Sequence, residues 1–502
     1  MVGIFIENKK FKEQIEYVFT TVSEVLGIDV YFYTENEINL SAEIDFCNVN
    51  IVYKDSEKYS NFIDKLDKKV IIENSNKLFS QRYLEADSVP QSVRKYNLDY
   101  NIKNKKDIIS IFSDDAELFI KEEINKITSN IDIVSDIFFM LSRYEEVVLN
   151  YKSDDEIYNR FSAKESVAYK NNFLNRPIVN EQIELIWVLL KKLDNSLVRK
   201  HHWGDNSFAA CFTHDVDWIQ KHTNLGRALK DSVKLLVRNK EIALALKNLA
   251  NYVQSKSDYK EDPYWTFEYI ADMEKRLGFT STFYFMTGGE TNFDNKYIYN
   301  DKRVIDLIAD LERDGFECGY HGSFNSYNDY LKMKEEKINL DSIVKSEEYG
   351  IRQHFLRFSA PFTWRIQEKL GFLYDCTLSF ADSEGFRCGI CHPYKPFDIL
   401  ENRVLDIWEI PLIVMETSIM DSRYSGYGLD EATEKVKFLI NQVEAYSGIF
   451  TFLWHNSSLD RFNPQVSRWN SVYEQIMIYL HDKKCYGSNG KDILKKYINR
   501  GE

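Results

Sequence analysis

Residues 213–217 place two carboxylates, Asp215 and Asp217, two positions apart at the end of an apolar run. That run, residues 208–212, is typical of a buried strand. Because side chains alternate along a strand, both acids are expected on one side of it. Two like charges this close raise one pKa unless a cation neutralises them. The pair favours a general base beside a metal ligand; the alternative is a solvated Asx turn.

Three more side chains stand where strands are expected to end. His321 follows residues 316–320 and suits a divalent ion shared with Asp217, although a lone histidine is often structural. His455 leaves the apolar run 449–454 and suits a general acid. Arg357 belongs to an expected strand at 355–358 and would hold the base carboxylate by a bidentate contact. A structural ion pair is the alternative for Arg357.

The elements that must position these side chains alternate between strands and helices. Such alternation predicts a parallel α/β barrel or open sheet, in which the chemistry lies at the carboxyl ends of the strands. Strands are expected at 281–286, 316–320, 355–358, 404–408 and 449–454, and helices at 264–277, 302–314, 364–370, 429–446 and 466–482.

The first two hundred residues show a separate α/β pattern. Strands are expected at 2–6, 29–33, 50–53 and 69–72, and helices at 10–25, at 131–144 and after Pro177. No glycine-rich loop follows these strands, so a nucleotide site has no support. Arg143 and Glu146 fit a solvated helix end better than a domain contact. The polar stretch 200–206 predicts a boundary between an α/β domain at 1–205 and a second domain at 206–502.

Residues 221–261 interrupt the second domain just after Asp217 and are expected to be helical. Basic residues outnumber acidic ones there, although the whole chain is acidic. The position beside the carboxylate pair suits a lid or a substrate wall. An amphipathic pair of surface helices is the other interpretation.

Composition narrows the class of protein. The chain has 502 residues and a net charge of −14, which argues against nucleic acid as the main partner. No apolar run is long enough to span a membrane, and the first residues do not form an export signal. Seven scattered cysteines fit reduced thiols. We therefore expect a cytoplasmic protein, of undetermined oligomeric state.

Six segments in order resemble the polysaccharide deacetylases, the NodB-homology superfamily, over about residues 207–485. The likeness is to the branch whose first motif is Asp-x-Asp, which includes peptidoglycan-deacetylase-like and allantoinase-like members. The N-terminal region resembles an uncharacterised domain attached to some bacterial members. The segments are residues 215–217, 319–323, 356–362, 372–378, 408–412 and 453–455.

The resemblance implies a distorted (β/α)7-type barrel, a divalent metal that is often zinc, and hydrolysis of an N-acetyl or related group. It implies that Asp215 is the general base, oriented by Arg357, and that His455 protonates the leaving amine. Asp217 and His321 become the metal ligands. The substrate would be an N-acetylated sugar or glycan in surface-polysaccharide metabolism. Candidate substrate contacts are Arg387, Trp454 and Pro361.

This sequence departs from the family at Asn325, where the resemblance expects a second metal-binding histidine. An amide oxygen is a poorer zinc ligand than imidazole. Three possibilities follow: a weakly held metal with Asn325 in its shell, completion of the shell by another group such as His214, or no catalytic metal. His214 points to the opposite side of an ideal strand from Asp215 and would need a bend to take part.

Cys388 and Cys391, followed by His392, match the spacing of a haem-c attachment motif. Without an export signal, a loop near the site is the preferred interpretation, with a structural or redox role as an alternative. The leading functional hypothesis is a carbohydrate deacetylase. The alternatives are a catalytically silent barrel that binds a glycan or a partner protein, and a hydrolase of ureide or other amide bonds.

Overall fold

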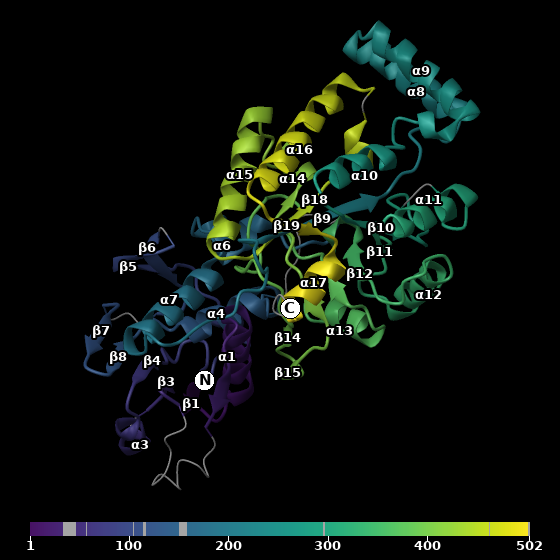
Figure 1. The fold of residues 1–502 in the computed structure, drawn as a ribbon. Helices are drawn as coiled ribbons and strands as arrows, with labels where there is room; N and C mark the ends of the chain where they lie inside the picture. Colours follow the sequence, from purple (N-terminus) through teal and green to yellow (C-terminus); the bar gives the residue numbers. More distant parts are fainter. Residues whose placement is uncertain are drawn as a thin grey trace.

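The computed structural model describes residues 1–33, 47–56, 58–103, 105–113, 117–149, 158–294, 297–460 and 462–499. These residues form two α/β parts, each with its own main sheet (Figure 1). None of the described helices is both long and apolar enough to cross a membrane.

The N-terminal part is built on a six-stranded sheet in the order β2-β1-β3-β4-β8-β7. The strands from β2 to β8 run parallel, and β7 is antiparallel to β8. Helix α1 ends at Gly27, whose positive φ of 61° closes the helix in the left-handed conformation that glycine favours. The elements are β1 (Val2–Ile6), α1 (Lys12–Leu26), β2 (Val30–Phe32), β3 (Val49–Lys54), α3 (Ser60–Lys65), β4 (Lys69–Glu73), β5 (Arg94–Ile102), β6 (Lys105–Ser110), β7 (Ile120–Glu123), β8 (Lys126–Ser129), α4 (Ile133–Leu141), α5 (Tyr144–Val148), α6 (Val167–Lys170) and α7 (Ile178–Leu193).

The C-terminal part is built on a curled parallel sheet with the strand order β16-β13-β12-β11-β10-β9-β18-β17. Strand β19 pairs with the first half of β9, and β10 pairs with its second half. The elements are β9 (Ala209–Val216), α8 (Leu225–Lys234), α9 (Ile242–Ser257), α10 (Phe267–Arg276), β10 (Thr282–Met286), α11 (Lys302–Arg313), β11 (Glu317–Gly322), α12 (Tyr330–Asp341), β12 (Gly350–Gln353), α13 (Phe362–Lys369), β13 (Tyr374–Asp375), β14 (Phe397–Asp398), β15 (Arg403–Val404), β16 (Trp408–Glu409), β17 (Val414–Met415), α14 (Glu416–Met420), α15 (Leu429–Ala445), β18 (Ile449–Leu453), α16 (Pro464–Asp482), β19 (Tyr486–Ser488) and α17 (Gly490–Ile498).

The mixed α/β class and the barrel-like parallel sheet confirm the coarse expectation from the sequence. One strand was placed wrongly. Residues 355–358 are not a strand, because the preceding segment β12 makes the ladder with β11 and β13 instead. Residues 404–408 likewise divide between the ends of two short strands, β15 and β16. The error at 355–358 matters for the site, because Arg352 lies in β12 and His354 directly follows β12.

The expected helical insertion at 221–261 is a pair of helices, α8 and α9, joined by a short π-helical segment, Leu235–Asn239. The pair projects away from both sheets at one end of the molecule (Figure 1). Its chain leaves the sheet just after β9 and returns to it through α10 and β10.

The two parts share buried contacts, including one hydrophobic cluster that contains residues from both. Arg143 and Glu146 lie within this interface and are 1% and 5% exposed, so the expectation of a solvated helix end was wrong. Glu146 accepts hydrogen bonds from Arg387 at 2.7 and 2.9 Å and forms an ion pair with Arg143 at 2.8 Å. Burial alone would raise the pKa of Glu146, but the two guanidinium groups lower it to about 2. The domain boundary at 205 remains a prediction.

Removing one member of this network should strongly destabilise the whole chain. Arg387→Met leaves the buried carboxylate of Glu146 with Arg143 alone, and breaking a buried ion pair costs about 3–5 kcal/mol. Urea denaturation of the full chain measures the loss.

The matched control is Arg423→Met, which breaks an ion pair with Asp421 whose arginine is 73% exposed. Exposed pairs contribute about 0–1 kcal/mol. An equal loss of stability in both variants would show that the buried network is not what joins the two parts.

Candidate metal centre

Three strand ends of the C-terminal sheet bring potential metal ligands together. Asp217 follows β9, His321 lies in β11, and His354 follows β12. One ligand atom from each lies within 4.8 Å of the others. His321 Nε2 is 3.2 Å and His354 Nε2 is 3.4 Å from the same carboxylate oxygen of Asp217. The carboxyl ends of parallel strands meet at one edge, which explains the convergence.

The orientation of these groups suits a divalent cation. His321 Nδ1 lies 2.9 Å from the carbonyl oxygen of Arg352, so it donates there and turns Nε2 toward the cluster. His354 Nδ1 is buried and has no hydrogen-bond partner among the described residues. Two imidazole nitrogens and one carboxylate oxygen form a donor set typical of zinc and similar ions. The residues therefore fit such an ion.

His354 supplies the second imidazole that the sequence analysis missed. The structure instead places the Asn325 amide oxygen 3.2 Å from Arg357 Nη1, where it accepts a hydrogen bond. His354 escaped notice because the strand before it was expected too far along the chain. With β12 correctly placed at 350–353, the rule that chemistry follows strand ends would have identified it.

Asp215 lies beside the cluster, as expected, but with a different arginine. Its Oδ2 is 3.8 Å from His321 Nε2, and its Oδ1 is 3.5 Å from Arg352 Nη1. Arg352 is fully buried and also donates to Thr213 Oγ1 at 3.1 Å. Arg357 donates to the carbonyl oxygens of Tyr158 and Phe324. The position beside the Asp215 carboxylate, expected for Arg357, is occupied by Arg352.

His455 approaches both carboxylates from β18. Its Nε2 is 3.9 Å from Asp215 Oδ2 and 3.7 Å from Asp217 Oδ2. Its Nδ1 lies 2.6 Å from Glu416 Oε1, and Ser458 donates to the same oxygen at 2.7 Å. Burial alone would lower the pKa of His455, but Glu416 and then the two aspartates raise it to about 10. His455 therefore carries a proton at neutral pH. Glu416 was missed although it directly follows the apolar run 412–415.

The acidic and basic side chains of the cluster shift the pKa values of their neighbours. Burial favours the neutral form of Asp217, but His354, His321 and His455 hold its pKa well below the ordinary value. Burial likewise lowers the pKa of His321, while Asp215 and Asp217 raise it above the ordinary value. The net result is a compact group of alternating charges.

His214, which the sequence offered as an alternative metal ligand, is not part of the cluster, because both of its ring nitrogens contact other groups. Its Nδ1 lies 2.7 Å from the carbonyl oxygen of Trp454, and its Nε2 lies 2.9 Å from Glu274 Oε1. Tyr473 and Ser281 also donate to Glu274, which is fully buried. These contacts tie β9 to the end of β18 and so fix the neighbours of His214 and Trp454, namely Asp215 and His455.

The structure places the three candidate substrate contacts away from open surface. Arg387 is 2% exposed and is bound to Glu146. Trp454 is fully buried, and its ring lies 5.4 and 5.3 Å from those of Phe452 and Tyr473. Pro361 is buried at the start of α13. All three candidate substrate contacts are therefore buried side chains.

Cys388 and Cys391 are also buried, and burial raises the pKa of each thiol. Cys391 Sγ lies 3.3 Å from Asn180 Oδ1, and His392 Nδ1 lies 2.8 Å from Asn180 Nδ2. Asn180 belongs to α7, so the segment packs against the N-terminal part. Together with the protonated thiols, this placement fits a structural role.

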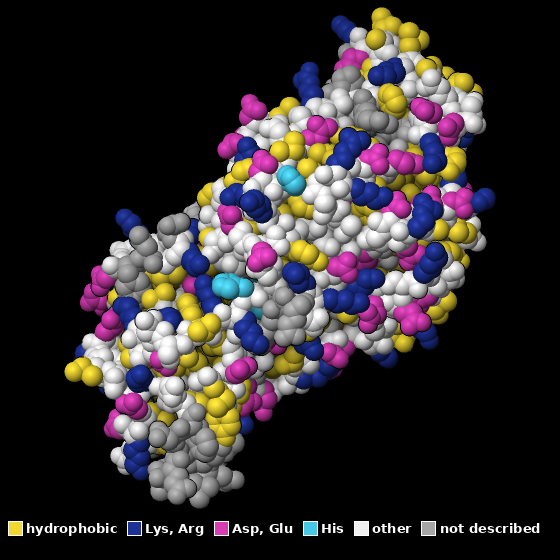
Figure 2. Space-filling model, viewed as in Figure 1, with side chains coloured by type: hydrophobic (Ala, Val, Ile, Leu, Met, Phe, Trp, Pro, Cys, Tyr) yellow, Lys and Arg dark blue, Asp and Glu magenta, His cyan; other side chains and the backbone are white. Residues whose placement is uncertain are grey.

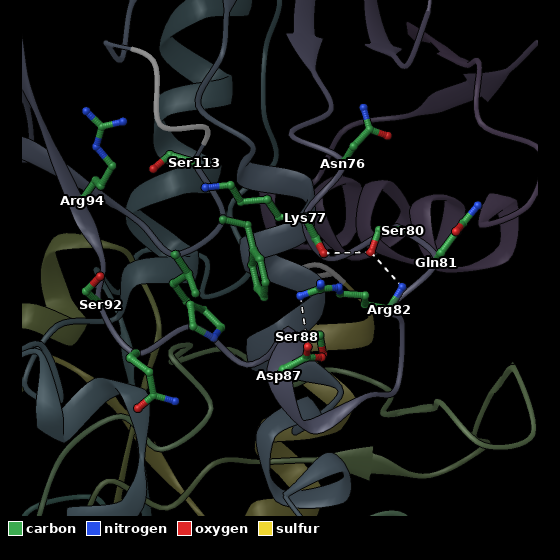
Figure 3. Close-up of a pocket in the computed structure, with 14 residues that line it drawn as sticks. Asn76, Lys77, Ser80, Gln81, Arg82, Asp87, Ser88, Ser92, Arg94 and Ser113 are labelled. Carbon is green, nitrogen blue, oxygen red and sulfur yellow. Dashed lines mark hydrogen bonds and ion pairs between the residues drawn. The ribbon is translucent and has the colours of Figure 1, made fainter.

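A hollow lies in the N-terminal part, mainly in the segments that follow β4 and β6 (Figure 3). Its volume is about 680 Å³, and its lining is mostly polar, with Lys77, Arg82 and Arg94 outnumbering Asp87. Arg82 Nη1 donates to Asp87 Oδ2 at 3.0 Å. The described residues that line the hollow include no histidine, so the hollow differs in composition from the strand-end cluster.

Comparison with known proteins adds limited information. A family of unknown function (DUF7033) matches residues 4–195, which is the N-terminal part. No curated protein matches the sequence. The chain is similar to a crystal structure from Mycobacterium smegmatis whose assignment as a polysaccharide deacetylase is itself provisional, with a TM-score of 0.39 and 15% identity. That match covers 61% of this chain and 95% of the other.

If His354 is a ligand, its loss should lower metal affinity more than the loss of a neighbouring residue that is not a ligand. His354→Ala should weaken zinc binding by more than the roughly 10–100-fold that removal of an outer partner costs. Elemental analysis and competition with a chelating dye measure the effect.

Asn325→Ala is the matched control, because it tests the position that the sequence suggested and should leave affinity within a few-fold. Equal affinities for wild type and His354→Ala, with weakened binding in Asn325→Ala, would reverse the assignment.

Proposed function

We propose that the protein is a metal-assisted hydrolase that removes the acetyl group from an N-acetylated sugar or glycan. The observation that carries the proposal is the group of Asp217, His321 and His354 with Asp215 and the protonated His455 beside it. The motif resemblance in the sequence selects the acetyl amide among the possible substrates.

In this proposal the chain divides the work among named atoms. Asp217, His321 and His354 hold the cation, which when bound polarises the acyl carbonyl and the attacking water. Asp215 accepts the proton of that water, and Arg352 provides the fixed positive charge beside it. His455 gives its Nε2 proton to the departing amine nitrogen, and Glu416 stabilises its charged form.

The arrangement explains why the acid and base have different roles although they are adjacent. Asp215 faces Arg352, whereas His455 is hydrogen-bonded to Glu416 on its far side. In this proposal these different charged partners assign the base and the acid to different residues. A barrel that only binds a glycan has no need for this separation. Hydrolysis of a ureide would use the same groups, so the substrate panel must decide between them.

Removing the base or the acid should abolish turnover while leaving the metal in place. Asp215→Asn and His455→Ala should each lower acetate release on the order of 10²–10⁴-fold. The assay follows acetate release from N-acetylated sugars, nucleotide sugars and oligosaccharides, and ammonia release from ureides, with zinc, cobalt or manganese added.

Arg357→Lys serves as the control, because Arg357 lies outside the group around Asp215 and its loss should change turnover by less than the loss of Asp215. Equal acetate release by wild type and Asp215→Asn would remove Asp215 as the base. Saturable glycan binding without any release, unaffected by both substitutions, would favour the binding barrel.

A further inference from the structure

The helix pair α8 and α9 has its large apolar side chains on the outside. Leu225, Leu229 and Val233 recur every fourth residue on α8 and are 45–54% exposed. On α9, Ile242, Leu246 and Val253 are 63–65% exposed. Each spacing places the three side chains along one face of its helix. Figure 2 shows hydrophobic side chains gathered at this projecting end of the molecule.

The inside of the pair is small and polar instead. Ala228 and Ser232 on α8 face Ala245 and Asn248 on α9, and all four are at most 4% exposed. Asn248 donates to Ser232 Oγ at 3.0 Å, and its own Oδ1 lies 2.9 Å from His222 Nε2. Because the side chains between the helices are small, the helices pack closely there, and the leucines of the outer faces do not take part in that packing. The apolar side chains of the outer faces are therefore left 45–65% exposed in the described part of the chain.

The charge of the pair indicates what could cover these faces. Residues 225–257 contain seven basic and two acidic residues, a net charge of +5 in a chain of net −14. The exposed Lys230, Lys234 and Lys247 each follow an apolar residue of an outer face, so they flank it. An apolar face flanked by lysines is the pattern of helices that lie in a membrane surface. A second copy of the pair would bring two positive faces together.

We propose that the outer faces of α8 and α9 dock onto an anionic membrane surface. The apolar side chains would enter the headgroup boundary, and the flanking lysines would contact anionic lipid headgroups. The pair would lie on the membrane surface without crossing it.

The base of the pair is joined to the rim of the candidate metal centre. Asn456, which follows His455, donates to the carbonyl oxygens of Trp218 and Tyr264 at 2.7 and 2.8 Å. These two residues lie on either side of the insertion. Lys221 forms an ion pair with Asp460 at 2.8 Å. Docking would bring the rim near the membrane, and if the proposed function holds, the glycan substrate is one presented at that surface. The docking itself does not depend on the hydrolysis.

Sedimentation of the full chain with vesicles tests the docking. One set of vesicles is phosphatidylcholine alone, and the other has one part phosphatidylglycerol to two parts phosphatidylcholine. The chain should bind the anionic vesicles and lose binding as salt rises. Each lysine near an anionic surface contributes about fivefold, so Lys230→Glu/Lys234→Glu/Lys247→Glu should weaken binding by on the order of a hundredfold or more.

A second variant, Leu229→Ser/Val233→Ser/Leu246→Ser, removes apolar surface and should also abolish binding. Its matched control is Leu331→Ser/Ile338→Ser on α12, where the side chains are 74% and 56% exposed, and it should bind as wild type does. Val233→Trp places a fluorophore on the face, and its emission should shift to shorter wavelength with anionic vesicles. Thermal melting and zinc content confirm that each variant is folded.

Three results would overturn the proposal. The first is no binding of wild type to anionic vesicles, and the second is undiminished binding by the serine variant. The third is a dimer in solution that the serine variant loses while vesicles have no effect, which would assign the face to a second copy. Failure of acetate release with vesicle binding intact would refute the proposed function alone.

Discussion

Two carboxylates leave the end of a fully buried strand two residues apart, and much of the C-terminal part serves to neutralise them. Burying like charges is costly unless cations stand beside them. Arg352 faces Asp215, while His321, His354 and His455 surround Asp217. These four groups come from three other strands: His321 from β11, Arg352 and His354 from β12 and the residue after it, and His455 from the end of β18. The parallel sheet thus brings residues that are far apart in sequence around one short acidic segment.

Behind this group, a second buried pair fixes the strands that carry it. His214 bridges the carbonyl oxygen of Trp454 and the carboxylate of Glu274. His214 precedes Asp215, and Trp454 precedes His455, so Asp215 and His455 are held relative to each other through their neighbours. Asn456 then holds the two ends of the helical insertion. The three consecutive residues Trp454, His455 and Asn456, at the end of β18, therefore connect the segment that carries Asp215 with the helical insertion.

The N-terminal part contributes to the same body through the network of Glu146 with Arg143 and Arg387. Arg387 donates to the carbonyl oxygen of Ser379, and Cys391 is bound by Asn180 of α7, so the segment between β13 and β14 is held from both sides. Arg387, which the sequence offered as a candidate substrate contact, instead joins the two parts through Glu146.

The sequence by itself determined the α/β class, most strands and helices, the Asp215/Asp217 pair and the two histidines at the ends of β11 and β18. These follow from local patterns, because a buried strand is apolar and the polar residue after it stands out. It could not determine the ligand set, because β12 has few apolar residues and Arg352, Gln353 and His354 give no local signal. Only the tertiary structure decided that His354 and not Asn325 lies with Asp217 and His321, that Arg352 and not Arg357 lies beside Asp215, and that Arg387 is buried. Each of those outcomes depends on which strands are neighbours in the sheet, and pairing between distant segments leaves no local pattern in either segment.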